Sequence, residues 1–85
     1  MNSSQSTDTS PAQVRVTGWR AGAQTVSAIQ AIREASQLGL ADAKGLVDLV
    51  LAGAPIVVDV DNPESAQDLV SALDRLRFDA EQIRR

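Results

Sequence analysis

The sequence contains no histidine, no cysteine and no tyrosine, and only 2% of its residues are aromatic. Without imidazole or thiolate there is no Ser-His triad, no cysteine nucleophile, no disulfide and no zinc site of the usual nitrogen and sulfur ligands. The longest run without a polar side chain, Leu49–Val58, is interrupted by Gly53 and Pro55 and is too short to cross a bilayer. These absences exclude most enzyme mechanisms, and we expect a protein that is not an enzyme and holds no cofactor and no metal.

The 85 residues, 44% hydrophobic and 22% charged, have the length of a single domain and the composition of a folded globular protein. The net charge is −3, from 8 Lys and Arg against 11 Asp and Glu, which argues against direct binding to nucleic acid. Residues 1–10 are polar and do not resemble a secretory signal. We therefore expect a cytoplasmic protein that does not contact a membrane.

The beginning of the chain changes character near residue 14. Residues 1–13 are almost free of apolar side chains, which predicts a flexible polar tail, and residues 14–85 are predicted to form the domain. Val14 and Val16 alternate with polar residues, and this period of two predicts a strand that ends at Gly18.

Two helices are predicted after a loop over residues 19–23. Apolar residues at helical spacing predict the first helix over residues 24–36 and the second over residues 40–51. Gly53 and Pro55 then end the second helix, because glycine favours the turn after a helix and proline cannot continue one.

The last part of the chain predicts a strand, a helix and a weaker strand. The β-branched run over residues 56–60 is too short for a helix, Asn62 and Pro63 have the chemistry of a helix start, and residues 78–83 can form a final strand. The order is β-α-α-β-α-β. The predicted fold is an α+β two-layer sandwich, with three helices on one face of a small, mainly antiparallel three-stranded sheet.

A resemblance to a known family rests on the two predicted helices of the first half. The residues that carry it are Val26, Ala28-Ile29, Ala31-Ile32-Arg33, Leu38-Gly39-Leu40, Ala43-Lys44 and Leu46-Val47. This pattern resembles the C-terminal domain of the bacterial ribosomal large-subunit stalk protein. The likeness extends downstream through the third helix, in the same order of elements that the periodicity predicts.

The resemblance implies a domain that performs no chemistry and docks translational GTPases or ribosome-associated factors through its first two helices. The residues at the matching positions are Val26, Ile29, Arg33, Gly39, Leu40 and Lys44. Aliphatic side chains beside two cations would form an apolar patch with a cationic rim, suited to a partner's hydrophobic groove flanked by carboxylates.

Two interpretations of Val26 and Ile29 stay open at this point. They can line the edge of the core, as aliphatic residues on the helices of small domains commonly do, or they can form the docking face. We expect the docking face, in which case Ile29→Asp should abolish partner binding and leave the fold cooperative.

Several positions depart from the stalk family. Thr25, Gln30 and Ala41 stand where the family has lysines, which weakens steering toward acidic surfaces. Gln37 stands where the family's junction has its first glycine, and the glycine after the third helix is replaced near Arg77. A short polar tail stands in the place of the family's N-terminal dimerisation domain, so we expect no tether to the ribosome.

Other residues suggest alternatives. Asp59 and Asp61 alternate at the end of a strand and could hold Mg²⁺, and together with Glu64 they are the one clustered set for carboxylate catalysis. Trp19 can anchor a partner from its loop or fold back over the helix ends. An adaptor outside translation, similar in architecture to the Clp protease adaptor, is the alternative function.

Overall fold

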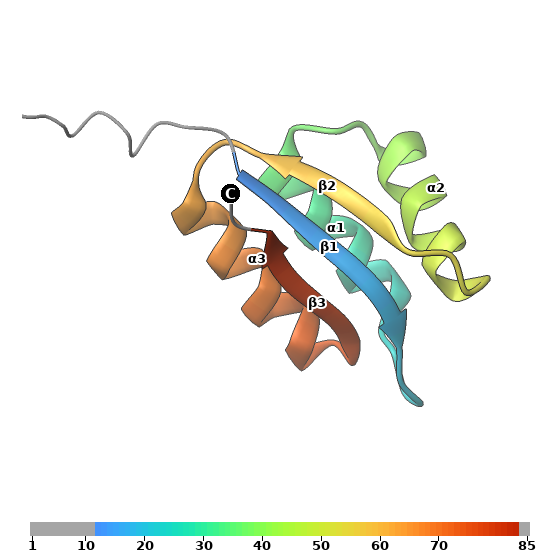
Figure 1. Ribbon diagram of the computed structural model, residues 1–85. Coiled ribbons are helices and arrows are strands. Elements are labelled where there is room, and N and C mark those ends of the chain that lie inside the picture. Colours follow the sequence, from blue (N-terminus) through green and yellow to red (C-terminus); the bar gives the residue numbers. More distant parts are fainter. Residues whose placement is uncertain (1–11, 84–85) are drawn as a thin grey trace, which may run out of the picture.

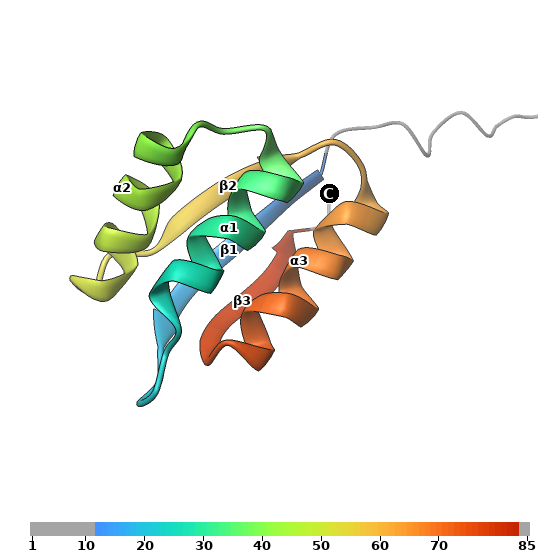
Figure 2. The same ribbon diagram turned by 180° about the vertical axis from the view of Figure 1, so that it is seen from behind.

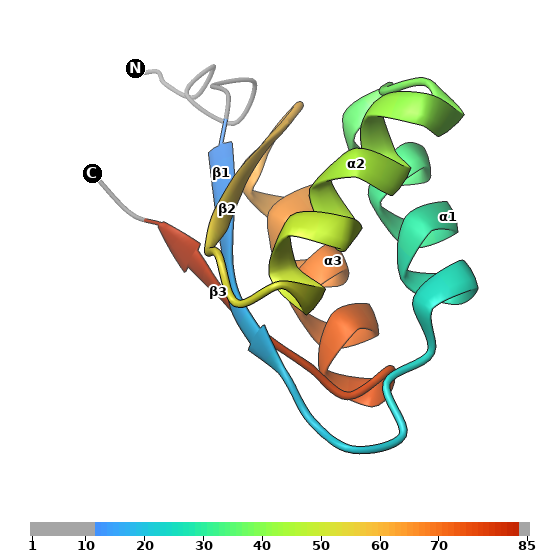
Figure 3. The same ribbon diagram turned by 90° about the vertical axis from the view of Figure 1, so that its right-hand side faces the viewer.

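The computed structural model describes residues 12–83. The strands are β1 (Ala12–Trp19), β2 (Ile56–Val60) and β3 (Phe78–Ile83), and the helices are α1 (Thr25–Ser36), α2 (Leu40–Leu51) and α3 (Pro63–Arg75). The strands form an antiparallel sheet in the order β2-β1-β3 (Figure 1). All three helices lie on one face of this sheet, as Figure 2 and Figure 3 show. The α+β two-layer sandwich and the predicted order of elements are confirmed.

The core lies between the sheet and the helices and is built almost entirely from aliphatic side chains. The largest fully buried side chains are Phe78, Ile32, Leu69, Leu73, Val14, Val16, Val47, Val50 and Val58. No polar or charged residue is buried within residues 12–83. Burial of apolar surface therefore stabilises this fold without any buried ion pair or disulfide. In the same part of the chain, no helix is long and apolar enough to span a membrane.

The start of α3 confirms the predicted cap. Asn62 has extended backbone, and its Oδ1 accepts a hydrogen bond from the backbone N–H of Ser65 at 2.8 Å. Pro63 occupies the first turn, where its missing N–H costs nothing, and Glu64 places a carboxylate near the positive end of the helix dipole. The local sequence therefore determines where this helix begins.

Strand β1 begins earlier than predicted. Ala12 pairs with Val60 and is buried, and Gln13 pairs with Asp59 on one side and Ile83 on the other. The predicted tail was therefore wrong for residues 12 and 13, because strands distant in the sequence supply their hydrogen bonds. The rest of the predicted tail lies outside the described residues.

A β-bulge at the end of β1 determines the direction of Trp19. The pairing with β3 shifts between Val16 and Gly18, so that Thr17 is the extra residue and Trp19 pairs with Phe78. In a regular strand, alternation would place Trp19 on the open face of the sheet. Instead, its Nε1–H donates a hydrogen bond to the carbonyl oxygen of Leu51 at 3.3 Å, at the end of α2. Trp19 belongs to the strand, not to the predicted loop, and folds back over a helix end with 47% of its surface exposed.

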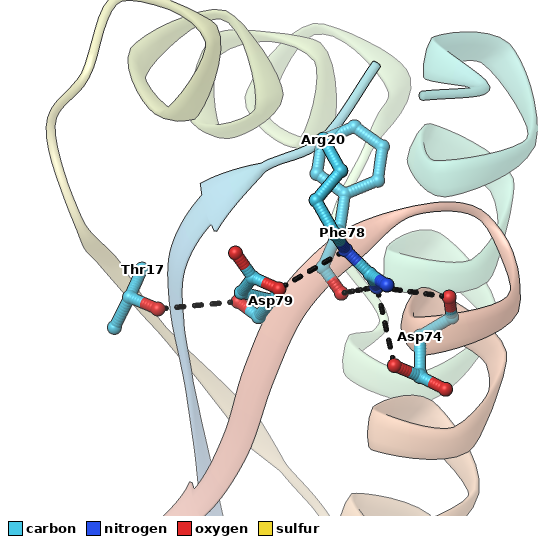
Figure 4. Close-up of polar contacts among 5 residues, drawn as sticks. All are labelled: Thr17, Arg20, Asp74, Phe78 and Asp79. Carbon is cyan, nitrogen blue, oxygen red and sulfur yellow. Dashed lines mark hydrogen bonds and ion pairs between the residues drawn. The ribbon is translucent and has the colours of Figure 1, made fainter. Parts of the chain in front are cut away.

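Arg20 ties the end of β1 to the α3–β3 turn (Figure 4). Its Nη2 donates to the backbone oxygen of Asp74, to Asp74 Oδ1 and to the backbone oxygen of Phe78, at 3.1, 3.1 and 3.3 Å. Its Nε lies 3.1 Å from Asp79 Oδ1, and its backbone N–H donates to the carbonyl of Arg77 at 2.8 Å. One guanidinium therefore connects a helix end, a turn and a strand, and it fixes the loop that leads into α1.

Two residues without glycine's freedom adopt left-handed backbone. Gln37, which caps α1, has φ 66°, and Arg77, which follows α3, has φ 70°. Both are helix-end positions, where this conformation satisfies carbonyl groups and glycine is the usual residue. In the resemblance to the stalk family, Gln37 stands where that family has a glycine, and a second family glycine is expected near Arg77.

We expect Gln37→Gly to stabilise the protein by about 0.5–1 kcal/mol, because glycine adopts left-handed backbone without the strain that a Cβ brings. The matched control is Gln30→Gly, the same change at an exposed position inside α1, which should cost about 0.5–1 kcal/mol. Urea unfolding followed by circular dichroism measures both. Equal destabilisation by the two changes would contradict the proposed role of the backbone at residue 37.

Candidate functional site

The large apolar side chains that face solvent are concentrated on the first two helices. Within residues 12–83 the exposed ones are Trp19, Val26, Leu40, Leu49 and Val57. Three of them belong to α1 and α2, and none belongs to α3. Helix α3 therefore has the ordinary amphipathic pattern of a helix that only covers a sheet, whereas α1 and α2 also expose apolar groups.

On α1, Val26 and Arg33 lie on the same side, since seven residues make two helical turns. Val26 is 73% exposed, and Arg33 is also exposed. The other flank of the helix carries Ala31 and Ala35, which line a groove with α3. Glu34 borders both sides, since it lines that groove and also a second pocket with Arg33. The side with Val26 and Arg33 is therefore the one next to α2.

On α2, Leu40 and Lys44 are one turn apart and lie on the same side. Leu40 is 56% exposed at the first position of the helix, directly after Gly39. Leu49 is nine residues after Leu40, which is half a turn out of phase, so it lies on the opposite side of α2. We define the α1–α2 surface as Val26, Arg33, Gly39, Leu40 and Lys44. Val26 and Leu40 each lie in the first turn of their helix, and because α1 and α2 run in opposite directions, they lie at opposite ends of this surface.

Ile29 does not belong to this surface. It is only 9% exposed and packs in the core with Ala28 and Ile32. The expectation that Ile29 faces a partner was therefore wrong. Its position three residues before Ile32 places it toward the core side of α1.

The charges on the α1–α2 surface are fewer than its sequence suggests. Lys44 Nζ lies 3.2 Å from Asp48 Oδ2, one turn along α2, and both side chains are more than half exposed. Arg33 takes part in no ion pair within residues 12–83. Together α1 and α2 carry these two cations against the carboxylates of Glu34, Asp42 and Asp48. Of the two cations predicted for the rim, Arg33 therefore has no ion-pair partner within residues 12–83, and Lys44 already pairs with Asp48.

Gly39 is an exposed N-cap, with φ −73° and no side chain to accept a hydrogen bond. A Cβ at this position would meet nothing within 4 Å. Its backbone does not require glycine, and its local effect is to leave the approach to Leu40 free of a side chain.

The acidic alternatives do not gather into a site. Asp59 Oδ1 accepts a hydrogen bond from Gln13 Nε2 at 2.8 Å on the open face of the sheet. Asp61 follows β2, and Glu64 lies in the first turn of α3. Across residues 12–83, no three acidic side chains come close enough together to hold a metal ion.

Sequence reasoning missed the exposure of Leu49 and Val57, which stand next to the buried Val50, Ile56 and Val58 in one apolar stretch. The spacing of Leu49 from Leu40 is the signal that could have placed it off the apolar face of α2. In comparisons with known proteins, no family model matches the chain, and no curated protein matches its sequence.

Proposed function

We propose that the protein is a non-enzymatic docking module that binds a partner protein through the α1–α2 surface. The observation that carries this proposal is the exposure of Val26 on α1 and of Leu40 on α2, two adjoining helices. The other apolar side chains on the same flanks of these helices are buried. Burying one such side chain in an interface is worth about 1.5–3 kcal/mol. Val26 and Leu40 together supply an apolar anchor, and Arg33 on the same surface supplies a charge that can select a partner.

The proposed partner class is the translational GTPases, in the cytoplasm. The support is the resemblance of α1 and α2 to the ribosomal stalk domain, together with the left-handed backbone at Gln37, where that family has glycine, and at Arg77, near which a second family glycine is expected. The fold by itself does not define a function, so the partner class rests on these residues.

A second candidate is an adaptor with a partner outside translation. The charge of the surface favours it, since Lys44 is paired with Asp48 and the two helices carry more carboxylates than cations. An acidic GTPase would be attracted weakly by such a surface. The two candidates use the same residues and differ in the partner.

Calorimetric titration of purified translational GTPases, each loaded with a non-hydrolysable GTP analogue, tests the partner class. We expect at least one to bind with a Kd in the micromolar range, with little dependence on salt, because the contact is mainly apolar. Absence of binding by every GTPase would contradict this class and favour the adaptor.

A further inference from the structure

Helices α1 and α3 lie side by side over the sheet (Figure 2). A groove lies between them, on the flank of α1 that faces away from the α1–α2 surface. Its volume is about 280 Å³. Its floor consists of Ala31 and Ala35 from α1, Ala72 from α3 and the buried side chain of Leu69. The groove is open to solvent, and its three alanines present only short methyl groups between the two helices.

Two carboxylates line the same groove, one from each helix. Glu34 on α1 and Asp68 on α3 are both exposed, and neither takes part in an ion pair within residues 12–83. No cationic side chain lines the groove. Glu64 lies one turn before Asp68 on α3, and like charges at this spacing repel each other. The groove therefore combines an apolar floor with a negative rim.

We propose that this groove is a second docking site, which takes an arginine or lysine side chain from a basic segment of a partner protein. The aliphatic stem of such a side chain would lie on the alanine floor, while its charged head would reach the carboxylates of Glu34 and Asp68. The volume is just below the range of about 300–1,000 Å³ that is usual for small-molecule pockets. It suits one or two side chains of a docking segment better than a free ligand.

This site goes beyond the proposed function, because it uses the opposite flank of α1 and the opposite sign of charge. The side with Val26 and Arg33 offers an apolar patch with a cation, and the side with Glu34 offers a groove with anions. The two surfaces adjoin, because Arg33 and Glu34 also line one common pocket, and one partner can contact both.

The test is an NMR titration of the isotope-labelled full chain with an acetylated, amidated amphipathic peptide rich in arginine and leucine. The comparison peptide has glutamine in place of every arginine. We expect shifts in the amide signals of Ala31, Glu34, Asp68 and Ala72 with the arginine peptide only. The double variant Glu34→Gln/Asp68→Asn, which changes only exposed side chains, should weaken binding about five- to tenfold, as expected for the loss of two exposed ion pairs.

The matched control is Asp42→Asn, which removes one exposed carboxylate on α2 away from the groove. It should leave the Kd within about twofold, since charges beyond a Debye length are screened at physiological salt. Equal weakening by the control would contradict the groove and indicate general attraction to an acidic protein. Binding of the glutamine peptide, or shifts confined to Val26 and Leu40, would also overturn the proposal.

Discussion

Ile29→Asp is expected to cost about 4 kcal/mol or more of the free energy of unfolding. The isoleucine is 9% exposed, so the change removes about 1.5–3 kcal/mol of apolar burial and also places a carboxylate where no water or cation reaches it. Domains of this size are stable by only about 5–10 kcal/mol. Urea unfolding followed by circular dichroism should show a large fall in the midpoint or an already unfolded chain.

Val26→Asp is the matched control, because it is the same kind of change three residues earlier on the same helix. Val26 is 73% exposed, and the first turn of α1 contains no acidic residue. A carboxylate there meets the positive end of the helix dipole, so the stability should stay within about 0.5 kcal/mol of the wild type. If Ile29→Asp unfolds no more easily than Val26→Asp, then Ile29 is not part of the core.

The second large effect is expected on binding. The double variant Val26→Asp/Leu40→Asp should weaken the complex with the best-binding translational GTPase about 100-fold or more. Each change removes an apolar contact worth about 1.5–3 kcal/mol and leaves a carboxylate to be desolvated in the interface. Calorimetric titration measures the loss, and circular dichroism verifies that the variant is folded.

Leu49→Asp is the control for this effect. Leu49 is 49% exposed, close to the 56% of Leu40, but it lies on the opposite side of α2. Its replacement should change the Kd by no more than about twofold. A loss as large as that of the double variant would mean that the partner binds a different side of α2.

The positions of most elements could be predicted because their ends are determined locally. Gly53 and Pro55 stop α2, and Asn62 with Pro63 starts α3, whatever the rest of the fold does. The early start of β1 was missed although Ala12 continues the alternation of Val14 and Val16, because alanine is a weak strand former and Ala12 is held by pairing with β2. The bulge that turns Trp19 toward α2 likewise depends on the pairing with β3.

The candidate site was predicted in part. The exposure of Val26 and Leu40 matches the expectation and the burial of Ile29 does not, because the helical period alone could not separate Val26 from Ile29. The ion pair between Lys44 and Asp48 could have been predicted from their spacing of four residues. The groove between α1 and α3 could not, since it depends on how two distant helices pack.

The most direct measurement is a map of amide chemical-shift changes in the isotope-labelled protein during titration with a translational GTPase that binds it. We expect the largest chemical-shift changes at Val26, Arg33, Gly39 and Leu40 and along the neighbouring turns of α1 and α2. Changes confined to α3 or to the open face of the sheet, with Val26 and Leu40 unaffected, would contradict it.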